Sequence, residues 1–413
     1  MNCARVLQRI TTGVGALGHW GTVAIGLSIP VSVALDNLLL AVVLFIWLIG
    51  SQYPEKLLLI WANPVYRAAM LLFTLLLTGT LYGNPAPGDA KLYLLKYFDL
   101  ALIPVIGWTF LDNRRRYRAL RLLATAFALV VVVSCALKAG LTPQSLWLHG
   151  TPESPIVFKS RLTHNILIAF AAFLFAWLAC NAGTRVAKLG WSALCLLAVT
   201  NITLMVEGAT GYVLLAALVL LFSWQHFRFR GIGIAILAGL AVIVTLSTIP
   251  GPFQSRIEQI LYELNYERAD RPASTSTGFR LEFYRNTLTL IGKQPVLGYG
   301  TGGFPAAYAE LVKDTGQKHS RNPHNEFMLI SVQIGLIGLA AFIWLLWQQW
   351  RLAPQLPTPL ECGLAQGLVL SMGIICMLNS PLLDHTEGLL YAWLTALLYA
   401  GLPVHRQTSG SSA

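Results

Sequence analysis

The stretch HNEFMLISVQIGLIGLAAFIWLLW, residues 324–347, decides the fold class. It is longer than the roughly 20 residues that an apolar helix needs to cross about 30 Å of hydrocarbon. Similar runs recur along the chain, and we place them at 13–32, 34–51, 66–83, 93–111, 119–139, 162–181, 190–206, 211–225, 231–250, 324–347, 362–379 and 387–403. The sequence therefore predicts an all-α polytopic membrane protein with about twelve transmembrane helices.

The composition excludes a soluble globular protein. Of the 413 residues, 55% are hydrophobic and 11% are charged, whereas soluble domains carry about 25% charged residues. The net charge of +11 does not indicate nucleic-acid binding, because no basic, aromatic-rich soluble domain is present to carry it. The six cysteines lie in or beside apolar runs, so neither a disulfide framework nor a zinc site is indicated.

The short loops predict the orientation. Basic clusters fall on alternate loops, at Arg5/Arg9, Lys56/Arg67, 114–118, Arg185/Lys188, 227–230, Arg351 and His405/Arg406. Because basic residues are retained on the cytoplasmic side, both termini are expected there. The opposite, external side then holds the loops 140–161, 207–211, 251–323 and 379–388. The basic N-terminus continues into a second span without a clear cleavage site, so we expect a retained helix.

This orientation divides the chain into four parts. We expect a bundle of about nine spans at 1–250, an external loop domain at 251–323, a bundle of three spans at 324–403 and a cytoplasmic tail at 404–413. The large loop lies between the ninth and tenth spans. It is the one segment with enough polar sequence for a small extramembrane domain.

The loop has its own helical pattern. Residues 253–267 place apolar side chains at helical spacing, which predicts an amphipathic helix, and 278–295 predicts a second helix that ends at Pro295. GYGTGG at 298–303 formally matches a dinucleotide fingerprint, but no strand–turn–helix unit surrounds it. It is either a structural turn or a turn that brings backbone close to a ligand.

The motif SRNPHN at 320–325 suggests a base at the start of a span. Asn322 suits the N-cap and Pro323 the first helical position, which would put His324 in the first turn. The positive end of a helix disfavours imidazolium, and a neutral imidazole is a competent general base. The alternative is an interfacial histidine that makes one ordinary hydrogen bond.

The external arginines indicate an anion site, because the orientation rule does not explain them and guanidinium binds phosphate in bidentate geometry. Arg280 has no acidic neighbour on its predicted helix, whereas Arg285 can pair with Glu282. Arg161 comes from a partial repeat of SRNPHN, SRLTHN at 160–165. The remaining candidates are Arg321, with His164, Glu207 and Asp384 as supporting residues. The absence of DxD, Walker and HExxH patterns leaves no metal or cofactor indicated.

These pieces resemble the O-antigen ligase and polymerase-like superfamily of bacterial envelope glycosyltransferases. Residues 278–304 are similar to its pattern of an arginine, an aromatic four residues later, a proline and a GxG…F turn, which here includes Arg280 and Tyr284. His324 and Asn325 are similar to the His-Asn motif that follows. Members often carry a Ser-Arg pair between the seventh and eighth spans, where this chain has EGATG, so either Arg161 or another arginine must supply that charge.

The resemblance implies an O-antigen ligase in the bacterial inner membrane, with its active site facing the periplasm. Such an enzyme transfers a preassembled glycan from undecaprenyl pyrophosphate to lipid A–core oligosaccharide, without a metal or cofactor and with inversion at the anomeric carbon. His324 would be the base, and arginines would hold the pyrophosphate. The alternatives are an O-antigen polymerase that acts on lipid-linked repeats and a non-catalytic transporter of lipid-linked glycans.

Overall fold

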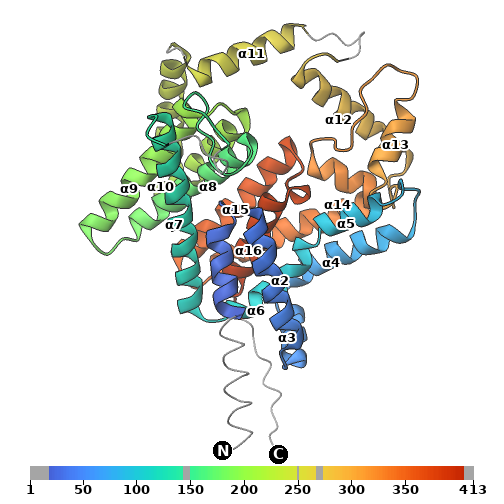
Figure 1. The fold of residues 1–413 in the computed structure, drawn as a ribbon, viewed down its shortest axis with the longest axis horizontal. Helices are drawn as coiled ribbons and strands as arrows, with labels where there is room; N and C mark the ends of the chain where they lie inside the picture. The colour runs from blue at the N-terminus through green and yellow to red at the C-terminus, as the bar shows by residue number, and fades with distance from the viewer. Residues whose placement is uncertain (1–17, 143–148, 249–250, 267–272, 404–413) are drawn as a thin grey trace, which may run out of the picture.

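The computed structural model describes residues 18–142, 149–248, 251–266 and 273–403, whose regular structure is helical without strands (Figure 1). The helices are α2 (Val33–Ile49), α3 (Tyr53–Ala62), α4 (Pro64–Thr78), α5 (Asp89–Lys96), α6 (Asp99–Thr109), α7 (Asn113–Lys138), α8 (Arg161–Cys180), α9 (Arg185–Thr200), α10 (Ala209–Thr248), α11 (Pro252–Tyr266), α12 (Ser276–Lys293), α13 (Phe304–Leu311), α14 (Glu326–Leu352), α15 (Pro359–Leu378) and α16 (His385–Tyr399). Shorter helical turns are η1 (Gly79–Leu81), η2 (Asn201–Met205), η3 (Ala353–Gln355) and η4 (Pro381–Leu383), and residues 18–28 are also helical. The all-α prediction is confirmed.

Several of these helices are suited to a membrane. In the described residues, eight are long and apolar enough to cross one, or nine if α2 and α3 form one span bent by 114°. The predicted spans 211–225 and 231–250 correspond to the two helical segments of α10, which meet at a kink at Arg228. The last predicted span corresponds to α16, which has only 15 residues. The chain is a multi-pass membrane protein, and the count of twelve spans stays a prediction.

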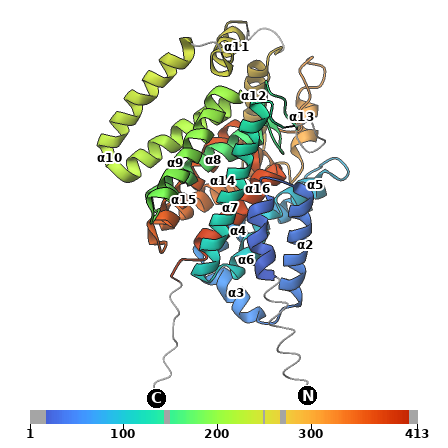
Figure 2. The same ribbon diagram turned by 60° about the vertical axis from the view of Figure 1, so that its left-hand side comes forward.

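The helices divide into a buried interior and an exposed apolar flank. In α8, 89% of the most apolar window is buried, whereas in α10 the share is 6%, so α8 is a core helix and α10 an outer one. α11, α12 and α13 gather at one end of the molecule, and α3 lies at the opposite end (Figures 1 and 2). The two helices expected at 253–267 and 278–295 are α11 and α12. Between them, residues 267–272 lie outside the described residues.

The glycine-rich turn after α12 inserts into a break in α14. Gly335 has φ of 68° and interrupts that helix, which leaves nearby backbone groups without helical partners. The N–H of Tyr299 donates to the carbonyl of Val332 at 2.7 Å, and the N–H of Leu336 donates to that of Pro295 at 2.8 Å. GYGTGG is therefore a structural turn that closes a broken membrane helix.

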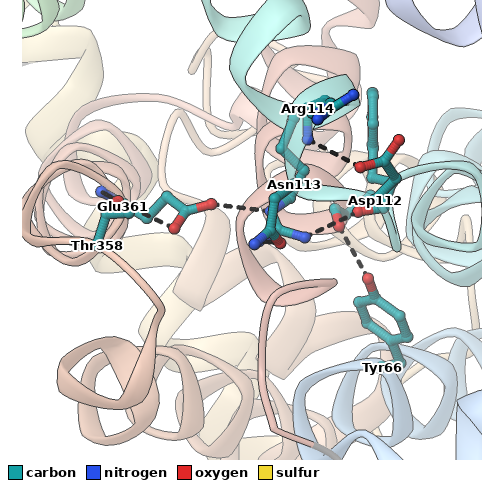
Figure 3. Close-up of polar contacts among 9 residues, drawn as sticks. Tyr66, Asp112, Asn113, Arg114, Thr358 and Glu361 are labelled. Atoms are coloured by element: carbon teal, nitrogen blue, oxygen red, sulfur yellow. Dashed lines mark hydrogen bonds and ion pairs between the residues drawn. The ribbon is translucent and has the colours of Figure 1, made fainter.

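A buried ion pair joins α7 to α15 at the end of the bundle remote from α12. Arg116 Nε donates to Glu361 Oε1 at 2.8 Å, and the arginine is 2% exposed. The second carboxylate oxygen of Glu361 accepts from Thr358 Oγ1 at 3.0 Å, as Figure 3 shows beside Asn113. Because buried charges are tolerated only when they are paired, this contact fixes the position of α7 against α15.

Candidate functional site

Three arginines from distant segments line one cavity of about 250 Å³. Arg161 opens α8, Arg256 lies on α11 and Arg280 lies in the second turn of α12. The remaining lining comes from Leu162, Asn165, Glu207, Gly208, Ala209 and Thr210. We call this cavity the arginine pocket. It brings together two of the predicted anion-binding residues, Arg161 and Arg280, with the predicted supporting residue Glu207.

Local structure adds to the positive potential of the arginine pocket. Ser160 caps α8 by accepting from the N–H of Thr163 at 3.3 Å, so Arg161 occupies the first helical position. A helix N-terminus carries a partial positive charge and unpaired N–H groups, which favour an anion. Glu207 offsets part of this charge, since its Oε2 lies 3.9 Å from Arg161 Nη1. The arginine pocket therefore suits an anion with more than one charge.

The EGATG turn is shaped by Asn165. Asn165 Nδ2 donates to the carbonyl of Glu207 at 3.2 Å. A Cβ on Gly208 would lie 2.3 Å from that same nitrogen, so a larger residue would force the Asn165 side chain to shift. This packing places Glu207 at the rim of the arginine pocket. This turn lacks the arginine of the Ser-Arg pair that the resemblance led us to expect here. Arg161 and Arg256 line the arginine pocket beside the turn.

His324 lies just before α14 rather than in its first turn. The prediction that Asn322 caps the helix and Pro323 begins it is wrong: the cap is Asn325, which accepts from Met328 N at 3.0 Å, and the helix begins at Glu326. Asn322 Oδ1 instead accepts from the N–H of His324 at 2.8 Å, which is an Asx turn. His324 has φ of 55°, a left-handed conformation that histidine adopts more readily than most residues.

The imidazole of His324 is held from two sides. Its Nδ1 lies 3.2 Å from Asn379 Oδ1, and its ring is nearly parallel to that of Phe283, with centroids 6.1 Å apart. An amide oxygen can only accept, so this contact favours the tautomer with the proton on Nδ1. Nε2 then carries the lone pair. His324 does not line the arginine pocket.

Tyr284 connects α12 to the segment that carries His324. Its hydroxyl lies 3.2 Å from the carbonyl of His324 and 3.0 Å from that of Met377. Burial raises the pKa of Tyr284, and Arg280 offsets part of the rise, so the phenol is a neutral donor. Arg280 and Tyr284 are one helical turn apart, about 6 Å along the axis. One turn of α12 thus links the arginine pocket to His324.

Asn325 and Asp384 complete the surroundings of His324. Asn325 Nδ2 donates to the carbonyl of Met377 at 3.2 Å, which ties the start of α14 to the end of α15. Desolvation raises the pKa of Asp384, and Lys96 and His324 offset part of this rise through their charge. The two side chains therefore interact through their charge.

Three predicted residues lie apart from this constellation. Arg321 pairs with Asp89 at the start of α5. Arg285 is exposed on α12, and its expected pair with Glu282 is not formed; that carboxylate accepts from the N–H of Ala273 at 3.1 Å. His164 is buried inside the bundle, where Nε2 lies 3.0 Å from Asn201 Oδ1.

Two residues near the site were not among the predicted site residues. Arg256 was one of several arginines predicted on the external side, and its presence on a predicted amphipathic helix was the available signal. Asn379 lies in the predicted external loop 379–388 and has no sequence signal of its own. The described residues contain no group of three or more His, Cys, Asp or Glu side chains arranged to hold a metal ion.

A comparison with protein families finds a match to part of the chain. Residues 192–343 match the family described as O-antigen ligase. The matched segment has 152 of the 413 residues. It runs from α9 into α14 and includes Arg256, Arg280 and His324, whereas Arg161 and Asp384 lie outside it. A comparison with curated proteins returns no match.

The matched family includes more than one kind of enzyme. Its members are glycosyltransferase-like ligases and polymerases that act on lipid-linked glycans. The recognition of an O-antigen ligase-like chain from its sequence is therefore confirmed.

Proposed function

We propose that the protein is an O-antigen ligase of the bacterial inner membrane. It takes a preassembled polysaccharide from undecaprenyl pyrophosphate and transfers it to lipid A–core oligosaccharide at the periplasmic face. The observation that supports this most strongly is the helix α12, on which Arg280 lines the arginine pocket and Tyr284 contacts the segment carrying His324. A cationic pocket and a basic imidazole one helical turn apart suit a reaction with an anionic leaving group and a hydroxyl nucleophile.

The arginine pocket binds the pyrophosphate of the donor. Arg161, Arg256 and Arg280 neutralise its charge, and the N-terminus of α8 adds N–H donors. As the glycosidic bond breaks, the leaving phosphate gains negative charge that these groups stabilise. The start of α8 lies at the lip of a predicted span, which a donor diffusing in the bilayer can reach.

His324 acts as the general base. Nε2 accepts the proton of the acceptor hydroxyl, whose oxygen attacks the anomeric carbon while the bond from that carbon to the pyrophosphate oxygen breaks. The bonding electrons leave with the pyrophosphate. Asn379 holds the ring, and Asp384 stabilises the imidazolium that forms. A single displacement inverts the configuration at the anomeric carbon.

Purified protein in lipid nanodiscs, given a polyprenyl-pyrophosphate glycan and lipid A–core, tests the proposal. We expect a glycan linked to the core, with inverted anomeric configuration by NMR. Retained configuration would contradict the single displacement. Elongation of the lipid-linked donor without capping of the core would identify a polymerase, and movement of donor across the bilayer without a new linkage would identify a transporter.

A further inference from the structure

The proposed transfer reaction does not use a second cluster of charged side chains, one of which lies just before α8. Asp36 of α2 is fully buried, and its Oδ2 lies 4.0 Å from Lys159 Nζ and 3.8 Å from His385 Nε2. Ser28 donates its hydroxyl hydrogen to the other oxygen of Asp36. We call Asp36, Lys159 and His385 the Asp36 cluster. It joins three segments that are far apart in the sequence.

The contacts in the Asp36 cluster are close but are not direct hydrogen bonds. Three of their atoms are buried and have no hydrogen-bond partner among the described residues: Asp36 Oδ2, Lys159 Nζ and His385 Nε2. Burial lowers the pKa of Lys159, and the carboxylates of Asp36 and Glu387 offset part of this shift. Polar groups about 4 Å apart are suited to bridging by internal water. Loss of one charge would leave the others uncompensated.

The chain positions of this cluster connect it to both halves of the site. Lys159 is two residues before Arg161 and directly precedes Ser160, the cap of α8. His385 directly follows Asp384, whose charge acts on His324. Asp36 thus contacts Lys159, which lies two residues before Arg161, and His385, which follows Asp384 in the chain. It lines neither the pocket nor the surroundings of His324.

We infer that Asp36 is a positioning residue for glycan transfer: it holds Arg161 through Lys159 and Asp384 through His385, and so fixes the leaving-group site relative to the base. This inference rests on the proposed function. It assigns a role to a residue outside the segment matched to the ligase family. Its charge, rather than its volume, is the property that matters.

Replacement of Asp36 by Asn in the full-length protein tests the inference. We expect kcat to fall by about 10 to 100-fold, since small displacements of catalytic groups are costly. Donor KM should rise less than it does in Arg161→Ala, because Arg161 is displaced and not removed while Arg256 and Arg280 remain in place. A fall in kcat that only follows the fraction of folded protein would overturn the positioning role.

A double-mutant cycle separates positioning from general damage. If Asp36 acts through Arg161, the Asp36→Asn effect on kcat should shrink in an Arg161→Ala background and persist in an Arg256→Ala background. Equal effects in both backgrounds would contradict the inference. If Asp36→Asn does not fold, Lys159→Arg is the substitute, because it keeps the charge and changes the contact with Asp36. Its effect on kcat should likewise shrink in the Arg161→Ala background, and an equal effect in both backgrounds would contradict the inference. Absence of transfer by the wild-type protein would instead refute the proposed function.

Discussion

Arg161 and Glu207 face each other at the rim of the arginine pocket, with Nη1 and Oε2 separated by 3.9 Å. The arginine side chain is 58% exposed and the glutamate 34%, so solvent screens their attraction. The carboxylate nevertheless competes with any anion that enters. The contact is therefore better suited to moderating donor affinity than to stabilising the fold.

Glu207→Gln should tighten anion binding. Removal of a partly exposed partner is worth no more than about 1 kcal/mol, or roughly fivefold in affinity. Inhibition of transfer by inorganic pyrophosphate measures the effect, and Glu310→Gln, an exposed acid on α13, controls for the change in net charge. Weaker inhibition in Glu207→Gln would mean that the carboxylate orients Arg161 instead.

Arg280 and Arg285 form a matched pair on one helix. Arg280 lines the arginine pocket, whereas Arg285 is exposed and absent from its lining. Arg280→Ala should lower kcat by about 100 to 1000-fold, the usual cost of losing one group that stabilises developing charge. Arg285→Ala should have little effect on transfer assayed with purified donor and acceptor. Similar losses in the two variants would remove the arginine pocket from the mechanism.

His324→Gln should abolish most transfer without loss of donor binding. A general base contributes about 100 to 10,000-fold to the rate, and glutamine keeps a side chain able to reach Asn379. His319→Gln is the control, because this histidine is exposed in the same loop. The rate constant under saturating donor tests this prediction. If His324→Gln retains a near-wild-type kcat, His324 is not the general base.

The sequence predicted the helices well because a membrane span is a matter of length and apolar content. The basic cluster at 227–230 already indicated a break between two spans, and the structure places it as a kink at Arg228. The role of His324 stays a prediction, and its placement in the first turn of the helix was wrong. Asn322 can either cap a helix or form an Asx turn, and its additional bond from Ser380 Oγ, at 2.8 Å, favours the turn.

The sequence also identified single arginines but not their arrangement in space. Arg161 and Arg280 stood out because positive charge on the external side needs an explanation. Their meeting in one pocket depends on the packing of α8 against the turn at Glu207 and of α11 against α12, which spacing along the chain does not encode. Arg256 was missed for that reason.

Gly335→Ala should destabilise the protein by roughly 3 kcal/mol or more. A Cβ at this position would lie 1.8 Å from the carbonyl oxygen of Val296, and φ of 68° adds backbone strain. Gly373→Ala on α15 is the control, because its Cβ would meet no atom within 4 Å and alanine favours helix. Thermal unfolding in detergent should separate the two variants; equal midpoints would show that the turn can move away from α14.

Glu361→Ala should leave Arg116 buried without its ion partner. Loss of one member of a buried pair costs about 3 to 5 kcal/mol, because the remaining charge is not compensated. The exposed pair between Arg115 and Asp112, at 3.6 Å, provides the comparison, and Arg115→Ala should cost less than about 1 kcal/mol.

Replacement of both Arg116 and Glu361 by apolar residues should recover much of the stability, since no charge then remains buried. If the double variant were no more stable than Glu361→Ala alone, the arginine's bond to the carbonyl of Phe110, at 3.1 Å, would be the contact that holds α7.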